Sequence, residues 1–404
     1  MLALLAWKNI WRNRKRSLII ITAITFGLWG GLVAGAVMMG WGESMVNTAI
    51  NRDLGHIQIH SSGFTGDRGV NLYIPDGIDI LQNIRSLPNV KAASGRTLVD
   101  GMAASPSSTF GVRIAGIDPE NEGRVTSIKD ILTEGTYFET DRKNPVIIGK
   151  KLADRLNLKI HSKLVLSFQS MDENLVYGAF RIVGIFKSES SAFDESHVFV
   201  LQKDLLRLFG SKPVIHEIAV RADSSKSIPF IFAALKKEYS GLSIETWKEL
   251  SPETAAVAAA MESWSYVFVG IILMALIFGI TNTMLMAVME RTQELGILMA
   301  VGMKKGKVFI MILLETIMLS ITGGICGMIT GAVTITALSR TGLDLTAFAS
   351  SLESFGASTV LYPFLPAGMY FILVAMIIAA AGIASTMPAW KAIHLKPSDA
   401  IRAY

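Results

Sequence analysis

Residues 263–302 read SWSYVFVGIILMALIFGITNTMLMAVMERTQELGILMAVG, and this stretch decides the fold. The part that ends at Met289 has no charged side chain and is longer than the roughly 20 apolar residues that a helix needs to cross a bilayer. At Glu290 the sequence becomes polar, and it becomes apolar again shortly after Gly302. This pattern predicts a membrane helix, a short surface helix and a second membrane helix. Such a surface helix can receive force from a soluble partner.

Four segments have the length and apolar character of membrane helices. They are residues 18–40, 261–289, 308–338 and 363–387, and Glu315 is the only charge in the third. The first is too long to be a removed signal peptide. Hydrophobic residues make up 51% of the chain and the mean hydropathy is +0.44, which is typical of an integral membrane protein with one soluble domain.

The distribution of lysine and arginine predicts the orientation. Basic side chains gather in residues 1–17, 290–307 and 388–404, and short basic segments stay on the cytoplasmic side. Residues 41–260 and the loop 339–362 then lie outside the cytoplasm. Long domains are translocated regardless of their charge, so the net charge of +5 gives no reason to expect nucleic acid as a partner.

The long insert, residues 41–260, mixes strand and helix patterns. Predicted strands are residues 56–60, 146–148, 163–168, 180–186 and 197–201. Predicted helices are residues 79–86, 150–157, 202–209 and 228–239. The single cysteine, Cys326, lies in the third span, so the insert has no internal disulfide. We expect an α+β domain, with two lobes as an option, that is held by its own core.

The sequence gives little support for catalysis. It has no GxxxxGK(S/T) phosphate-binding loop, so we expect no ATP hydrolysis by this chain. His56 and His60 share one face of a strand, but without a third ligand we interpret them as ordinary surface histidines rather than a metal site. Asp172 and Glu173 fit an exposed hairpin tip better than a catalytic pair. We therefore predict no enzyme activity, no metal and no cofactor in this chain.

The N-terminal segment has the pattern of an amphipathic helix. Leu4, Trp7, Ile10 and Trp11 form one face, and Lys8, Arg12, Lys15 and Arg16 gather on another. Such a helix would lie in the interface, with indoles among headgroups and cations near anionic membrane lipids. The alternative is that the charges only fix the topology.

Two predicted spans carry glycine at every fourth position. The first has Gly27, Gly31 and Gly35, and the third has Gly323, Gly327 and Gly331. Such ladders let helices approach closely, within one protomer or across a dimer. Glu315 and Asn282 are costly in lipid and should face protein or water, and we expect Glu315 to be paired or to cap a helix end.

Several strings resemble the permeases of the lipoprotein-releasing system (LolC/LolE-like), within the wider MacB/FtsX-type (type VII) group of ABC transporter permeases. They are WKNIWRN at 7–13, GHIQIH at 55–60, VIIG at 146–149 with Leu152-Ala153, residues 282–302, PAWKA at 388–392 and PSDAIR at 397–402. The resemblance covers essentially the whole chain and implies four membrane helices with a MacB-like periplasmic core domain between the first two.

The resemblance implies that ERTQELGI at 290–297 is the coupling helix that docks on a cytoplasmic ATPase. The implied coupling residues are Glu290, Arg291, Glu294, Leu295, Gly296 and Met299. Their chemistry agrees, because Glu290 and Glu294 would share a helix face, Leu295 and Met299 offer an apolar contact, and Gly302 can close the helix in a left-handed cap. The alternative is a solvated surface helix.

The resemblance also implies the partners. They are an ATPase dimer that binds ATP and Mg, a second permease in a homodimer or paralogous heterodimer, and a lipoprotein substrate drawn from the outer leaflet of the inner membrane. One permease of the lipoprotein-releasing pair grips a periplasmic carrier through a proline-bearing hook. Here the corresponding hairpin is short, and no proline occurs between Pro145 and Pro213, so carrier binding stays open.

The substrate cavity implied by this family would lie along the outer halves of the first two spans. The predicted wall consists of Leu32, Val33, Met38, Met39, Phe268 and Leu273, and the alternative is that these side chains face lipid. Two other functions remain open for the chain. One is a mechanotransmitter that moves no substrate and activates a periplasmic partner, and the other is export of periplasmic amphiphiles or peptides.

Overall fold

The computed structural model describes residues 6–394, apart from residues 8, 9, 13, 140, 141, 211, 212, 349–351 and 353–357. The chain forms two compact units. The helical unit comprises Met1–Glu43, Ala258–Asp344 and Val360–Tyr404, and the α+β unit comprises Ser44–Val257 and Leu345–Thr359.

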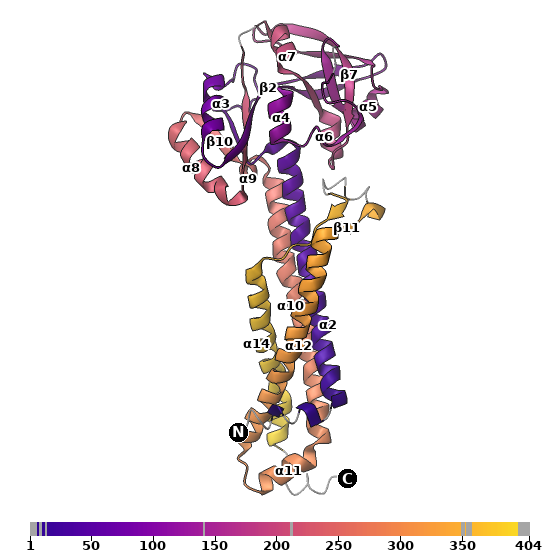
Figure 1. Cartoon of the computed structure of the whole chain (residues 1–404), viewed down its shortest axis with the longest axis vertical. Helices are drawn as coiled ribbons and strands as arrows, with labels where there is room; N and C mark the ends of the chain where they lie inside the picture. Colours follow the sequence, from indigo (N-terminus) through magenta and orange to yellow (C-terminus); the bar gives the residue numbers. More distant parts are fainter. Residues whose placement is uncertain are drawn as a thin grey trace. The chain divides into compact units, whose positions relative to one another are not determined.

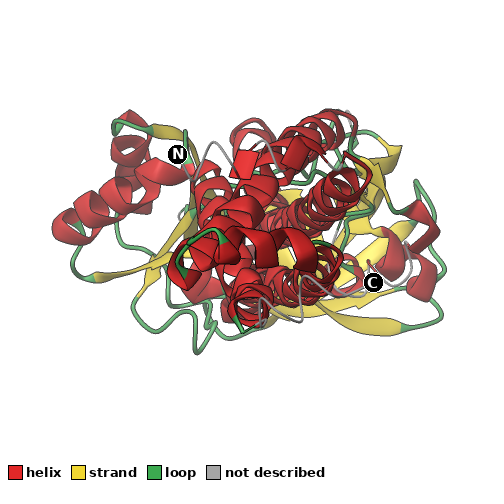
Figure 2. Ribbon diagram, turned by 90° about the horizontal axis from the view of Figure 1, so that it is seen from below, coloured by secondary structure: helices red, strands yellow, loops and turns green. Residues whose placement is uncertain are grey.

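Four long helices run side by side in the helical unit (Figures 1 and 2). They are α2 (Arg14–Ala49), α10 (Pro252–Glu290), α12 (Lys305–Thr341) and α14 (Ala367–Ile393). The short helix α11 (Thr292–Ala300) lies between α10 and α12, and strands β11 (Leu343–Asp344) and β12 (Val360–Leu361) pair antiparallel. Among the described residues these four helices are long and apolar enough to cross a membrane, which confirms the predicted number of spans.

All four of these helices extend beyond the predicted spans, α12 by three residues at each end. Helix α2 continues past residue 40 to Ala49, and α10 begins at Pro252 rather than at residue 261. Helix α14 continues through Pro388 to Ile393. Hydropathy marks where the hydrocarbon ends, whereas the alanine-rich start of α10 favours helix by propensity alone.

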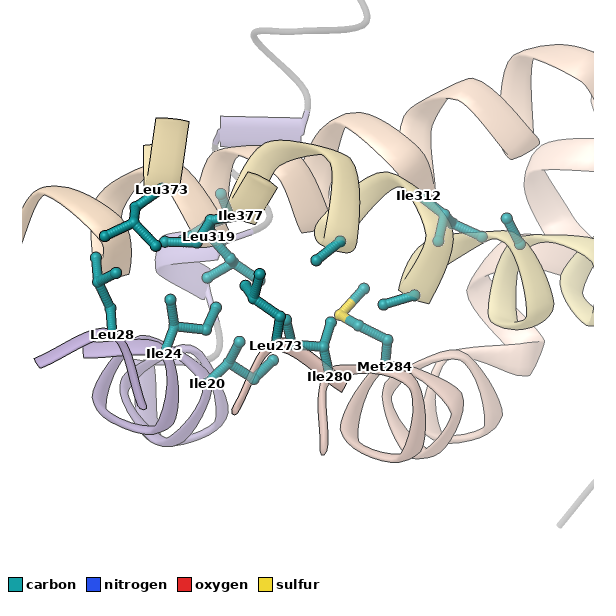
Figure 3. Close-up of a cluster of buried hydrophobic side chains, with 14 of the residues drawn as sticks. Ile20, Ile24, Leu28, Leu273, Ile280, Met284, Ile312, Leu319, Leu373 and Ile377 are labelled. Carbon is teal, nitrogen blue, oxygen red and sulfur yellow. The ribbon is translucent and has the colours of Figure 1, made fainter. Parts of the chain in front are cut away.

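The core of the helical unit is built from branched aliphatic and methionine side chains on all four helices (Figure 3). Ile24 of α2, Met284 of α10, Leu319 of α12 and Ile377 of α14 are each at most 4% exposed. Helices that are apolar all round can pack in this way only where their outer faces meet lipid instead of water.

The glycine ladder of α12 lies against α2. A Cβ on Gly323, Gly327 or Gly331 would come within 3.0 Å of an α2 atom, with Leu32 the neighbour of Gly331. The Thr25 hydroxyl donates to the Gly323 carbonyl at 3.1 Å across this contact. In the α2 ladder, Gly27 faces Leu276 of α10 closely, Gly31 makes ordinary contact with Ile272, and Gly35 has only Leu365 near it, at 4.0 Å. Both ladders therefore have neighbours within this chain.

This packing predicts an unequal response of two neighbouring glycines. We expect Gly327→Ala to destabilise the helical unit by about 1–3 kcal/mol, because its methyl group would meet the Thr25 carbonyl oxygen at 2.9 Å. Gly324→Ala is the matched control, since its methyl group has no neighbour within 4 Å. Thermal unfolding of both variants in detergent checks this, and equal melting temperatures would contradict it.

In the described part of the α+β unit, ten strands form one continuous pairing network. They are β1 (Ile57–Ser61), β2 (Val90–Ala104), β3 (Thr109–Ile117), β4 (Leu132–Gly135), β5 (Pro145–Gly149), β6 (Lys163–Gln169), β7 (Leu175–Phe186), β8 (His197–Leu201), β9 (Glu217–Ala222) and β10 (Leu242–Thr246). All five predicted strands and all four predicted helices are confirmed. Strands β2, β3, β4, β9 and β10 were missed because their residues are too mixed for a clear alternation.

Strand β2 is shared by two lobes. Its first half pairs with β9 in the order β10-β1-β9-β2, and its second half pairs with β3 and β6. The pairs β3–β8, β8–β5, β5–β7 and β7–β6 complete a closed ring of six strands. The α+β unit thus consists of an open four-stranded lobe and a barrel, each with its own buried core.

Short helices cover the two lobes. They are α3 (Gly77–Ser86), α4 (Pro119–Val125), α5 (Lys150–Leu156), α6 (Ser191–Ser196), α7 (Gln202–Phe209), α8 (Ile228–Glu238) and α9 (Trp247–Leu250), with the 3₁₀ turns η2 (Ser225–Ser227) and η3 (Thr346–Phe348). Helix α2 ends in a π-helical segment, η1 (Ile50–Leu54), that leads into β1. Asp172 and Glu173 lie at the exposed tip of the β6–β7 hairpin, as predicted.

A buried arginine joins three segments of the α+β unit. The Arg96 guanidinium on β2 donates to both carboxylate oxygens of Glu122 on α4, at 3.1 and 2.6 Å, and to Glu217 on β9 at 2.5 Å. It also donates to the carbonyl oxygen of Asp53 in η1 at 2.8 Å. Arg96 is 2% and Glu122 0% exposed, so each charge depends on the others for neutralisation.

His56 and His60 are buried, which corrects the expectation of surface histidines. His56 Nδ1 accepts from the Ala222 amide at 3.1 Å, and His60 Nε2 lies 3.0 Å from Glu217. Burial lowers the pKa of His56 and so favours its neutral form. The strand alternation placed both side chains on one face, but only the tertiary structure, which brings Ala222 and Glu217 of β9 against them, decided that they are buried.

Candidate functional site

The segment predicted to couple to a partner forms a sharp elbow between α10 and α12. Arg291 leaves the helical conformation with φ −106° and ψ 18°, so α10 and α11 are separate helices. Gly302 has φ +104°, and its amide donates to the Met299 carbonyl oxygen at 3.1 Å, which confirms the predicted left-handed cap. Lys304 is extended and α12 begins directly after it.

A chain of charged side chains fixes this elbow to the membrane helices. Arg291 Nη1 lies 3.2 Å from each carboxylate oxygen of Glu315 on α12, which confirms the predicted pairing of Glu315. Arg291 Nε donates to Glu294 Oε2 at 3.0 Å, and Glu294 also accepts from Arg12 of the N-terminal segment. We call these four residues, Arg12, Glu294, Arg291 and Glu315, the elbow ladder.

The ladder becomes more exposed from Glu315 outward. The Glu315 side chain is 2% exposed, that of Arg291 16% and that of Glu294 48%. Partial burial opposes the charge of Glu294, but hydrogen bonds from Arg291 and Arg12 outweigh it and lower the pKa of Glu294. Glu294 therefore stays ionised, and it links the N-terminal segment to α11.

The apolar face of α11 points the other way from the prediction. Leu295 is 2% exposed and Gly296 is buried, while Met299 packs half-buried against the core of the helical unit. Ile297 and Val301 are instead 49% and 83% exposed. Leu295 and Met299 thus hold α11 to its own helices, and Ile297 and Val301 form the exposed apolar surface. The local pattern does not reveal that Leu295 and Met299 pack into the core of the helical unit. The break at Arg291 also places Glu290 and Glu294 on different helices.

The N-terminal segment only partly follows the predicted faces. Trp7 and Trp11 are exposed and stack edge to face, with ring centroids 5.8 Å apart. Ile10 is 1% exposed and joins the core, so it does not share the surface of the two tryptophans. The predicted residues Leu4 and Lys8 lie outside the described residues, as does the side chain of Arg16.

An apolar groove of about 250 Å³ lies between α2 and α10. Small residues leave it open, and it is lined by Ile20, Ala23, Gly27, Ile272, Ala275, Leu276, Gly279, Ile280 and Thr283. Asn282 is exposed on α10 and is not among the lining residues. Glycines that recur on facing helices could have indicated this hollow in the sequence.

None of the six residues predicted for a substrate cavity lines this groove. Leu32 and Leu273 are buried in the core, Val33, Met38 and Met39 are half-buried, and Phe268 is 42% exposed. On α2 the groove is lined by residues of the first half of the helix, whereas the predicted residues Leu32 to Met39 lie in its second half. Large apolar side chains fill the space between helices, so the hollow forms where they are missing.

Two family models match this chain. The model described as MacB-like periplasmic core domain matches residues 17–238, and the one described as FtsX-like permease C-terminal matches residues 266–397. Among solved structures, the periplasmic region of MacB from Actinobacillus actinomycetemcomitans covers 53% of this chain and 94% of its own length. Its sequence identity is 15% and its TM-score is 0.35.

Curated relatives match over most of this chain. The pyoverdine export ATP-binding/permease protein PvdT of Pseudomonas fluorescens (strain Pf0-1) is 28% identical over 390 residues, which are 90% of this chain and 56% of PvdT. This chain thus spans about half the length of PvdT. The uncharacterized ABC transporter permease YvrN of Bacillus subtilis is 24% identical over 438 residues, with 98% of both chains covered.

Proposed function

Because this chain belongs to the MacB/FtsX-type ABC transporter permeases, we propose that it turns ATP hydrolysis by a separate cytoplasmic ATPase into work on a substrate outside the membrane. The fold class is as expected for this family, with four apolar helices and a MacB-like periplasmic domain. The narrower resemblance to the lipoprotein-releasing system stays a prediction.

The elbow ladder is the observation that carries this proposal. A helix can transmit force only if it is held to the elements that must move, and Arg291 holds α11 to Glu315 inside the bundle. Ile297 and Val301 offer an exposed apolar contact that suits a partner groove. In this proposal both termini and α11 are cytoplasmic, and the ATPase dimer supplies the bound ATP and Mg.

For the substrate we propose a lipoprotein or a related lipid-linked molecule drawn from the outer leaflet. Exposing acyl chains to water costs ~0.8 kcal/mol per CH₂, on the order of tens of kcal/mol for three chains, so they need an apolar surface throughout. The apolar groove is lined by α2 and α10. The half-buried Val33, Met38 and Met39 lie further along α2. Asn282 is exposed on α10, and its polar side chain would be costly in lipid. Its position therefore favours contact with a second permease copy there.

Export of a periplasmic amphiphile or peptide is the second candidate. It is favoured by the relatives, since the PvdT proteins are named for pyoverdine export and match 90% of this chain. In this version the same α2–α10 face would receive a soluble amphiphile. A mechanotransmitter that activates a periplasmic partner without transport would leave this face without a substrate.

The test is ATP-dependent release of acyl-labelled lipoprotein from proteoliposomes that hold this chain and its purified ATPase. We expect release by the wild type and release at least tenfold slower for Glu294→Lys, which would place three cations together in the elbow ladder. Glu253→Lys is the charge-reversal control, because Glu253 is exposed in the first turn of α10 and far along the chain from the elbow. ATP hydrolysis without release in the wild type would exclude lipoprotein as the substrate, and a parallel assay with a labelled amphiphilic peptide then tests the second candidate.

A further inference from the structure

A polar pocket of about 390 Å³ lies within the α+β unit. This volume falls in the usual range of small-molecule sites, roughly 300–1,000 Å³. Its lining includes five carboxylates and two guanidinium groups: Asp53, Asp100, Glu217, Glu245, Glu249, Arg68 and Arg113. Arg113 is already paired with Asp100 at 3.5 Å. Asp53 and Glu217 are paired as well, with Arg96. The carboxylates still outnumber the guanidinium groups, which favours a cation over an anion.

His60 aims an unpartnered nitrogen into this pocket. Its side chain is 3% exposed, and its Nε2 lies 3.0 Å from Glu217 Oε2. Burial alone would raise the pKa of Glu217, but Arg96 and His60 together lower it to about 2, so this carboxylate is ionised and can only accept. Nε2 must then carry a proton, and in that tautomer of the imidazole Nδ1 is an acceptor. Among the described residues, Nδ1 has no hydrogen-bond partner.

A second unpartnered acceptor faces the first. Glu245 Oε2 is buried without a hydrogen-bond partner in the described part of the chain, and it lies 3.7 Å from His60 Nδ1. That distance is too long for a direct hydrogen bond, even if Nδ1 were protonated. With the proton on Nε2, a group that donates two hydrogens can bond both Nδ1 and Oε2, and leaving both atoms unsatisfied would be costly.

An ammonium group matches these surroundings. It has three N–H donors and a positive charge, so it can bond both acceptors and still reach a third carboxylate. Phe64 also lines the pocket, and its ring stacks on His60 with centroids 5.4 Å apart, which helps to hold the imidazole in place. The described residues contain no group of three or more His, Cys, Asp or Glu side chains that could hold a metal ion.

We propose that this pocket binds a primary ammonium group, carried either by a free amine or by a lysine side chain of another polypeptide. Asp53 and Leu54 belong to η1, which directly follows α2, and Glu249 and Leu250 belong to α9, which precedes α10 by one residue. A bound cation would thus bridge the two segments through which the α+β unit continues into membrane helices. The proposal does not depend on which substrate the permease moves.

In the experiment, the full-length chain in detergent is titrated separately with cadaverine, 1,5-pentanediol and a short lysine-containing peptide. The heat of binding is measured by calorimetry. Cadaverine and the peptide carry the ammonium, and the diol is the uncharged analogue of cadaverine. We expect saturable binding of at least one ammonium probe, with one site per chain. Glu245→Gln should weaken it roughly tenfold or more, as expected for the loss of a charge-assisted hydrogen bond.

Glu238→Gln is the matched control, because it removes the same charge from an exposed position on α8 that does not line the pocket. It should bind like the wild type, and circular dichroism should show both variants folded. Tighter binding of the peptide would identify a polypeptide as the source of the cation, and tighter binding of cadaverine a free amine. The proposal is overturned if neither probe binds saturably, if the diol binds equally well, or if both variants weaken binding to the same extent.

Discussion

Replacing Arg96 with leucine should destabilise the α+β unit by about 3–5 kcal/mol, because it would leave Glu122 and Glu217 buried without their cation. That is a large share of the roughly 5–15 kcal/mol that stabilises a typical domain. The loss of stability should appear as a lower urea midpoint of the full-length chain when unfolding is monitored by fluorescence.

Arg124→Leu provides the matched control for this prediction. Arg124 pairs with Glu120 four residues away on α4, and its side chain is 64% exposed, so its removal should cost about 0–1 kcal/mol. If Arg96→Leu and Arg124→Leu had similar denaturation midpoints, the buried cluster would not hold the lobe together.

The same cluster predicts the direction of acid sensitivity. The folded pKa of Glu217, about 2, lies below its ordinary value of 4.5, so Glu217 contributes stability that is fully present above about pH 4.5. This contribution is lost as the pH falls from about 4.5 toward 2. The wild type should therefore lose stability more steeply than Glu217→Gln over this range, as measured by urea midpoints at successive pH values. A parallel decline would mean that other carboxylates dominate.

Replacing Arg291 with leucine should have the largest effect on coupling. It would remove the Arg291–Glu315 ion pair, which is a charge contact between the elbow and the buried carboxylate of α12. We expect a stability loss of about 3–5 kcal/mol in detergent and release of substrate near background, while the partner ATPase still hydrolyses ATP.

A double variant separates the two consequences. Arg291→Leu combined with Glu315→Leu removes both charges, so most of the lost stability should return. Release should stay near background, because Glu294 and Arg12 are then no longer connected to α12. If the double variant restored release as well, the ladder would serve stability alone and α11 would transmit force by other contacts.

Most of the architecture could be predicted from the sequence, since it depends on local pattern. The four spans follow from runs of apolar residues. Helix α7 follows from its helical periodicity, and strand β8 from a short apolar run rich in β-branched residues. The left-handed cap at Gly302 follows from glycine after a helical pattern. The family strings pointed to the elbow as the coupling segment and to a MacB-like domain.

The tertiary structure alone decided which surfaces are covered. Leu295 and Met299 were predicted to form an exposed apolar contact, yet they pack into the core of the helical unit, and Ile297 and Val301 are exposed instead. The groove between α2 and α10 forms where glycines and alanines of two distant segments face each other. Arg96, His60 and Glu245 show no local signal, because their partners are brought by β9, β10, α4 and η1. Local patterns set the type of each element through backbone geometry and hydropathy, whereas burial and pairing depend on contacts between residues far apart in the chain.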